Sequence, residues 1–358
     1  MSKPTRVCRL DKVFDGCGRR RAFIGLDVHK RTINAAVWLD GRIVATWVMP
    51  ANADKLAAML APHRAKIARV VYEAGPTGFG LARVLGRAGL GVEVVAPGRT
   101  PRASARENKS DRLDCAKLAE YAAKGLLKPV AVPSETQEAD RQLVRLRDQL
   151  VKKRRTVKQQ IRSFLLQHAI AEPRGLSSWS LAARAALRAQ ALGPQLRLCL
   201  DVLLDLLDEL EAHVRRIERA LSALAATERH AEAAAIARSH PGVGTVVAMS
   251  YLVEVHRGGR FRDPREVASY VGLAPMVRQS GQTRLDGPIV RTGRASMRAL
   301  LVEAAWRWRM RDPAARRLFA RLMRNTGSAK KAIVALARHL AINLWAMLTR
   351  REPYRAAA

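Results

Sequence analysis

The stretch from residue 22 to residue 49 reads AFIGLDVHKRTINAAVWLDGRIVATWVM and decides the class of the N-terminal fold. Apolar and β-branched residues lie on both sides of Asp40-Gly41, and a DG dipeptide between such runs is a strong signal for a β-hairpin. Further strand and helix patterns follow at residues 68–74, 79–89, 91–97 and 110–127. Strands that alternate with helices predict an α/β domain over residues 22–130.

The charge of the chain indicates its class of partner. The 358 residues include 64 Lys and Arg against 31 Asp and Glu, a net charge of +33. Because the arginines are spread along the chain, a large polyanion is the expected partner, and nucleic acid is the default interpretation. The four cysteines form no CxxC pair and have no His at zinc-ligand spacing, which is typical of free thiols in a reducing compartment.

Neither end of the chain predicts a membrane protein. Residues 1–21 carry charges throughout and no apolar run, so we interpret them as a loose basic leader and not a signal peptide. Residues 332–348 are apolar but are interrupted by Arg338, His339 and Asn343. They fall short of a transmembrane span and are typical of a buried helix, so we expect no membrane partner.

Residues 135–235 have the pattern of long helices. An a/d seam of about three heptads follows the spacing of Leu203, Leu207, Leu210, Val214, Ile217, Leu221 and Leu224. A weaker repeat precedes it, at Leu143, Leu146, Leu150, Val157, Ile161 and Phe164. An antiparallel hairpin, an intermolecular coiled coil and an intramolecular helical bundle all satisfy these patterns, and a seam left exposed would drive self-association.

Residues 239–350 form a third, mainly helical region that is again basic. From residue 239 to the end of the chain there are 22 Lys and Arg against 7 Asp and Glu, which favours a second surface facing nucleic acid. Gly242 and Gly244 lie in HPGVGTVVA between two helical patterns. This resembles a helix-hairpin-helix turn whose backbone N–H groups approach a phosphate, although an ordinary interhelix turn explains it equally well.

Four carboxylates in the α/β region form the candidate catalytic site. Asp27 lies at the middle of the first predicted strand, Glu73 ends a later strand, and Asp111 and Asp114 are three apart on one helical face. Oxygen ligands from two strands and a helix that converge would hold Mg²⁺, or Mn²⁺, for phosphoryl transfer. The basic neighbours Arg106, Lys109 and Arg112 would then hold the phosphate backbone.

Each of these carboxylates also has a simpler explanation. A single Asp in a strand is often only hydrogen-bonded at a turn, and an i,i+3 pair of aspartates early in a helix is favourable near the positive end of the helix dipole. The combination in this order within a strongly basic chain is what favours a metal site.

Three motifs carry a resemblance to a known family. GLDVHK (25–30), YEAGPTG (72–78) and KSDRLDCAKLA (109–119) together resemble the DEDD set of the insertion-sequence-110 family of transposases. The region that starts at HPGVGTVVAMSYLVEV is similar to the C-terminal transposase domain of that family. The resemblance implies an RNase H-like (RuvC-like) N-terminal domain, a central helical coiled coil and a mainly α-helical C-terminal domain.

The resemblance also implies a reaction and its partners. It implies a bacterial, cytoplasmic, nucleoid-associated recombinase that cleaves and rejoins double-stranded donor and target DNA, in a family where a structured bridge RNA guides some members. It places a serine nucleophile at Ser280, and a homo-oligomer, a dimer or a dimer of dimers, is expected. Four arginines around Ser280 would bind phosphate, namely Arg278, Arg284, Arg291 and Arg294. The alternatives are a metal-dependent junction endonuclease with water as nucleophile and a non-catalytic nucleic-acid-binding protein.

Overall fold

The protein consists of two compact units, residues 1–134 and 135–358. The computed structural model describes residues 10–15, 18, 20–97, 111–255, 261–280, 283–290 and 293–356, and of residues 111–113, 277–280 and 283–286 only the backbone. Each unit is described by itself below.

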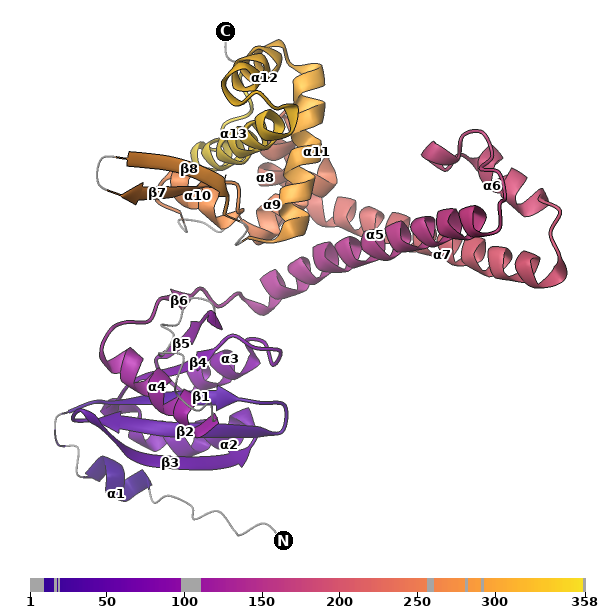
Figure 1. The fold of residues 1–358 in the computed structure, drawn as a ribbon. Coiled ribbons are helices and arrows are strands. Elements are labelled where there is room, and N and C mark those ends of the chain that lie inside the picture. The colour runs from indigo at the N-terminus through magenta and orange to yellow at the C-terminus, as the bar shows by residue number, and fades with distance from the viewer. Residues whose placement is uncertain are drawn as a thin grey trace. The chain divides into compact units, whose positions relative to one another are not determined.

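A six-stranded mixed sheet forms the centre of the N-terminal unit (Figure 1). Its strands are β1 (Ala22–Val28), β2 (Thr32–Leu39), β3 (Arg42–Pro50), β4 (Ile67–Glu73), β5 (Val92–Val95) and β6 (Pro129–Val130). They lie in the order β3-β2-β1-β4-β5-β6, with β1, β4 and β5 parallel and the pairs β1–β2, β2–β3 and β5–β6 antiparallel. This confirms the RNase H-like class.

The Asp40-Gly41 turn joins β2 and β3 as an antiparallel hairpin, which confirms the sequence signal. Both residues have positive φ, +50° at Asp40 and +82° at Gly41, as a type I′ turn requires. The run before this turn contains two strands and not one, because the polar residues 29–31 break it. Asp27 consequently lies next to the carboxyl end of β1 and not at its middle.

Helices cover both faces of the sheet. The helices of this unit are α1 (Leu10–Asp15), α2 (Ala53–Leu60), the 3-10 helix η1 (Ala61–Lys66), α3 (Gly80–Arg87) and α4 (Asp111–Ala123). Leucines of α2 and α3 pack with Ile24, Leu26, Val70 and Tyr72, the residues of β1 and β4 on one face. Leu118 of α4 packs with Val71 and Val95 on the opposite face.

Residues 10–15 differ from the loose leader expected from sequence. They form α1, and Leu10 and Phe14 are buried in the same core as α2 and α3. The Phe14 ring stacks on His63 at 4.6 Å, and Lys66 Nζ donates to the Phe14 carbonyl at 2.9 Å. Two buried apolar residues spaced four apart, with Val13 packed beside them, dock this segment despite its charged neighbours.

Two long helices, α5 (Glu135–Gln167) and α7 (Pro194–Ala225), run side by side in the C-terminal unit (Figure 1). They are joined through the 3-10 helix η3 (Leu176–Ser178) and α6 (Leu181–Ala189). Leu207, Leu210 and Val214 of the predicted seam are buried in this pairing. The chain covers the seam itself, so the argument for self-association through an exposed seam on α7 is wrong.

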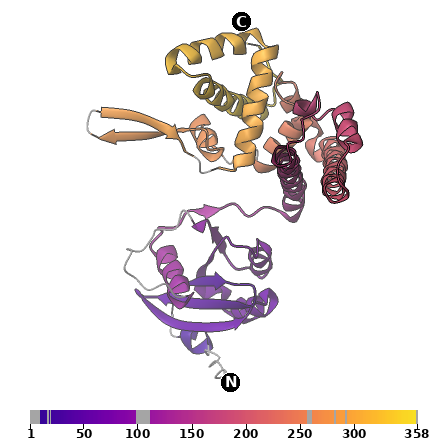
Figure 2. The same ribbon diagram turned by 45° about the vertical axis from the view of Figure 1, so that its right-hand side comes forward.

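The remaining helices pack around one core. They are α8 (Glu228–Arg238), α9 (Thr245–Glu254), α10 (Pro264–Tyr270), α11 (Ala295–Arg311), α12 (Pro313–Thr326) and α13 (Ala329–Arg350). The hairpin of β7 (Pro275–Ser280) and β8 (Thr283–Ile289) projects from these helices (Figure 2).

Helix α13 contains the apolar residues 332–348. It is long and apolar enough to cross a membrane by length and composition, but half of its most apolar window is buried. Ile333, Leu336, Leu340 and Leu344 lie in the core between α8, α10, α11 and α12. The expected buried helix is therefore confirmed.

Candidate active site and nucleic-acid interface

Asp27 and Glu73 lie on the same face of the sheet. Side chains alternate along a strand, so Asp27 shares the face of Gly25, and Glu73 shares the face of Val71. Gly25 pairs with Val71 in the parallel register of β1 and β4, which continues toward Asp27 and Glu73 at the carboxyl ends of both strands. Val71 packs on α4, so this is the face that α4 covers.

Gly25 is the reason that α4 comes so close to β1. A Cβ atom at Gly25 would lie 2.0 Å from the carbonyl oxygen of Cys115 and 2.6 Å from the backbone nitrogen of Ala119. Only glycine permits this approach of helix backbone to strand backbone. The contact places Asp114, which directly precedes Cys115, beside the end of β1 that carries Asp27.

The raised pKa of the Cys115 thiol indicates that negative charge lies near this contact. Burial raises the pKa of Cys115 to about 11, and the nearby carboxylate of Asp27, and less strongly that of Asp114, add to the rise. Both carboxylates are therefore close enough to disfavour a thiolate between them. Asp27 Oδ2 also lies 2.9 Å from His29 Nε2, a neighbour that the sequence analysis did not single out.

The carboxylates fit a hard divalent cation by their chemistry. Asp27, Glu73 and Asp114 offer oxygen ligands from β1, β4 and α4 beside one edge of one face, which is the donor type that Mg²⁺ prefers. Among the side chains that the structure describes, no three His, Cys, Asp or Glu form a metal-binding group. The side chain of Asp111, in the first turn of α4, is outside that set, so the four-carboxylate site stays a prediction.

Ser280 is the last residue of β7 and pairs with Thr283 of β8. It therefore lies at the end of a strand, next to the turn of the hairpin. Arg278 and Arg284 are on the same hairpin, paired with Leu285 and Gln279. Only the backbone of these residues is described, and Arg106, Lys109, Arg291 and the side chain of Arg112 also lie outside the described part.

Arg294 makes ion pairs that the sequence analysis did not predict. Its guanidinium group is paired with Glu254, and it lies 3.4 Å from Asp148 Oδ2, so two buried carboxylates hold it. Arg145 and Arg141 also pair with Glu254. Because Arg294 precedes α11 directly, this network fixes the chain after the β7–β8 hairpin to α5 and α9. Arg294 therefore anchors the base of the hairpin, and its contact with phosphate stays a prediction.

The two glycines of the predicted helix-hairpin-helix turn lie in different environments. Gly242 is buried, and a Cβ there would lie 2.4 Å from the Ala304 carbonyl oxygen and 2.8 Å from Trp308 Cβ. Its role is close packing against α11, which corrects the prediction that it contacts phosphate. Gly244 is exposed at the N-cap of α9 with open space around it, so of the two only Gly244 keeps a backbone that nucleic acid could reach.

Sequence reasoning missed a group of arginines on α12, at the end of α13 and in the residues after it. They are Arg317, Arg321, Arg324, Arg350 and Arg355, and they line one cavity. A signal was present, because no Asp or Glu occurs between Asp312 and Glu352. A long acid-free stretch with many arginines indicates a surface that no ion pair neutralises.

Comparison with known proteins identifies the family of this chain. The model of the IS116/IS110/IS902 transposase family matches residues 234–320, and the DEDD transposase model of IS110 elements matches residues 24–170. A putative transposase of Sinorhizobium fredii, y4qE, is 32% identical over 320 residues, which cover 87% of this chain and 78% of that protein. The chain belongs to the IS116/IS110/IS902 family of transposases.

Other members of this transposase family are similar over long stretches. The transposase of insertion sequence element IS1111A from Coxiella burnetii is 26% identical over 275 residues, 75% of this chain and 74% of that protein. The transposase of element IS1533 from Leptospira borgpetersenii is 25% identical over 350 residues, 94% of this chain and 98% of that protein. The chain is thus a DNA-binding phosphoryl-transfer enzyme, and its DEDD domain is a metal-dependent catalytic domain.

Proposed function

We propose that this transposase excises and inserts a mobile element with Ser280 as the nucleophile and with a divalent cation held by Asp27, Glu73, Asp111 and Asp114. The observation that carries the proposal is the contact of α4 with β1 at Gly25, which draws Asp114 to Asp27 on the face that also carries Glu73. Mg²⁺ or Mn²⁺ bound by these carboxylates would stabilise the negative charge that develops on the transferred phosphate.

The chain's own groups have separate tasks in this proposal. Ser280 Oγ forms a bond to phosphorus and gives up its proton to solvent, while the bond from phosphorus to the departing DNA oxygen breaks and that oxygen takes up a proton from solvent. Arg278 and Arg284 share the Ser280 hairpin and would bind the phosphates that flank the cleaved bond. Arg294 keeps the base of the hairpin in place through Glu254 and Asp148.

A covalent adduct tests the serine. Denaturation of the wild-type protein during reaction with element-end DNA is expected to trap a protein–DNA adduct, which Ser280→Ala removes. Asp27→Asn or chelation of Mg²⁺ reduces the adduct strongly, whereas Asp54→Asn, an exposed carboxylate in the same unit, leaves it unchanged. A Ser280→Ala protein that cleaves DNA at the wild-type rate would show instead that water is the nucleophile, as in a junction endonuclease.

We also infer that an element-encoded bridge RNA guides target choice. The support is the family resemblance together with a net charge of +33, which suits simultaneous contact with DNA and RNA. Insertion is expected to require RNA transcribed from the non-coding flanks of the element, and a change in the guide sequence should move the insertion site. Insertion at the same sites without that RNA would refute guidance.

We infer further that the protein works as a homo-oligomer in the bacterial cytoplasm, on the nucleoid. The support is an exposed apolar stripe on α7, because Leu198, Val202 and Leu206 are 66%, 57% and 41% exposed although α5 covers the predicted seam. Val202→Glu is then expected to lower the mass measured by light scattering. An unchanged mass with intact helicity would remove this stripe as an association surface.

A further inference from the structure

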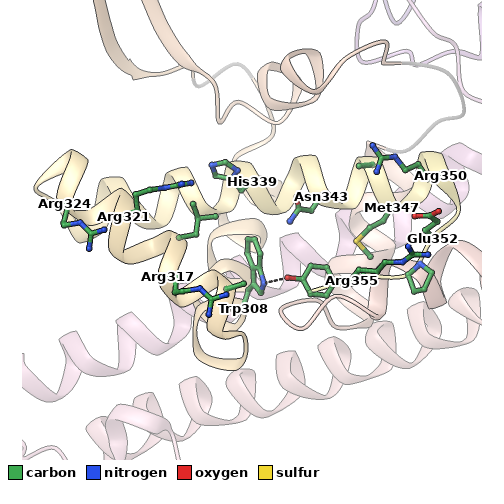
Figure 3. Close-up of a pocket in the computed structure, with 15 residues that line it drawn as sticks. Trp308, Arg317, Arg321, Arg324, His339, Asn343, Met347, Arg350, Glu352 and Arg355 are labelled. Atoms are coloured by element: carbon green, nitrogen blue, oxygen red, sulfur yellow. Dashed lines mark hydrogen bonds between the residues drawn. The ribbon is translucent and has the colours of Figure 1, made fainter. Parts of the chain in front are cut away.

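A cavity of about 750 Å³ lies between α12, α13 and the residues that follow α13 (Figure 3). Its lining comes from α11, α12, α13 and residues 352–355, all within the C-terminal unit. None of the residues that the sequence analysis assigned to the active site belongs to it. The cavity therefore calls for an explanation separate from the serine and the carboxylates.

Arginines dominate both ends of this cavity. Figure 3 shows Arg321 and Arg324 toward one end and Arg350 and Arg355 toward the other. With Arg317 they make five guanidinium groups against a single lining carboxylate, Glu352. None of the five makes an ion pair with any described residue. Uncompensated arginines at both ends of a cavity favour a ligand with more than one negative charge.

The interior of the cavity is suited to a flat, partly polar group. Leu318, Ala346 and Met347 provide apolar surface, and Asn343 and His339 provide hydrogen-bonding groups. Burial lowers the pKa of His339, and Arg338 and Arg321 lower it further, so the imidazole is neutral at neutral pH and can both donate and accept. An amide and a neutral imidazole over apolar surface can hold a nucleobase by its edge and its face.

The wall formed by the residues after α13 is fixed in place. Tyr354 donates its hydroxyl hydrogen to Asp312 Oδ2, receives a hydrogen bond from Trp308 Nε1 at 3.3 Å, and its backbone nitrogen donates to Ser239 Oγ at 2.8 Å. Its ring also packs on His240 at 4.5 Å. These contacts fasten the segment that carries Glu352 and Arg355, so the cavity is a preformed site and not a gap beside a loose end.

We propose that this cavity binds an unpaired nucleotide of single-stranded DNA, with the base inside and the flanking phosphates on the arginines at the two ends. The inference rests on the proposed function only in that DNA is the substrate, and it adds a site for a strand that strand exchange has separated from its complement. Bases that leave a duplex are bound in this way, by apolar surface and hydrogen bonds for the base and by basic groups for the backbone.

The volume of the cavity suits one nucleotide better than a duplex. A cavity of about 750 Å³ is in the size range of sites for one small ligand. A double helix could touch only the outer arginines. Single-stranded DNA can place one base inside while its backbone continues on both sides.

The test is the binding of a fluorescent 12-nucleotide single-stranded DNA to the full chain in EDTA, followed by anisotropy over a range of salt. Two variants remove arginines at opposite ends of the cavity, Arg321→Ala with Arg324→Ala, and Arg350→Ala with Arg355→Ala. The matched control is Arg307→Ala with Arg316→Ala, which removes the same charge from α11 and α12 outside the cavity. A duplex and an RNA of the same sequence are the competitors.

Each cavity variant is expected to weaken binding of the single strand about tenfold. The slope of the logarithm of the binding constant against the logarithm of the salt concentration should become shallower by about 0.7 for each phosphate that the variant no longer binds. Asn343→Leu should weaken binding without a change in the salt dependence, because it removes a hydrogen bond to the base and no charge. The control should bind as the wild type does, apart from a small uniform electrostatic loss.

Three outcomes would overturn the proposal. Equal losses of affinity in the cavity variants and in the control would show that only the overall charge matters. An equal loss for the duplex would show an outer surface for duplex backbone, and a preference for RNA would refute DNA as the occupant. The Ser280 adduct is measured separately, so a failure of this proposal leaves the adduct intact, and a missing adduct leaves the binding difference intact.

Discussion

Replacement of Gly25 by alanine tests whether the packing of α4 on β1 holds the carboxylates together. The added Cβ would lie 2.0 Å from the Cys115 carbonyl oxygen, whereas ordinary non-bonded contact needs about 3.5 Å. Helix α4 must therefore move by about 1.5 Å. Overpacking typically costs about 1–3 kcal/mol, and we expect the upper end of that range because the opposing atoms are backbone.

The displacement should affect both catalysis and the stability of the unit. A shift of about 1 Å in a reacting group can lower a rate about 100-fold, so metal-dependent DNA cleavage by Gly25→Ala should fall by about that factor. A destabilisation of about 3 kcal/mol should also make amide exchange in β1 and α4 about 100-fold faster. Hydrogen exchange followed by mass spectrometry measures this unit within the full chain.

Gly86→Ala is the matched control for Gly25→Ala. Gly86 is in α3 of the same unit, and a Cβ there meets open space. Alanine should stabilise this helix by about 0.5–1 kcal/mol and leave cleavage unchanged. If Gly25→Ala exchanged and cleaved as the wild type does, the close contact would have no role. Faster exchange with wild-type cleavage would refute the link between helix position and active site.

Two further predictions concern the C-terminal unit. Glu254 is 4% exposed and pairs with Arg141, Arg145 and Arg294, so Glu254→Gln should destabilise the unit by about 3 kcal/mol in urea unfolding, and exposed Glu303→Gln should not. Burial lowers the pKa of His240 from 6.5 to about 3. The stability from its neutral form is complete above pH 6.5 and falls as the pH drops toward 3, by about 2 kcal/mol at pH 5. His240→Gln should remove this part of the pH dependence, and an unchanged profile would contradict it.

The residue pattern by itself determined the class of the N-terminal fold and the placement of two acidic residues on its strands. Alternation along a strand assigns Asp27 and Glu73 to a face, and two residues with positive φ at Asp40-Gly41 make the hairpin, because both are local properties of the backbone. The spacing of leucines in residues 203–224 determined that α7 has an apolar seam that a partner helix must cover. The basic composition determined that the partner is a polyanion.

Only the tertiary structure decided what each of these faces meets. Periodicity gives the direction of a side chain but not its partner, which depends on residues far away in the sequence. Helix α5 covers the seam of α7, and the helix with Asp114 packs on Gly25. Glu254 forms an ion pair with Arg294, and α11 packs against Gly242. The arginines of α12 and α13 likewise line one cavity only because these two helices pack together in the folded chain. The hydrogen bond from Tyr354 to Asp312 holds the residues after α13 at the wall of that cavity.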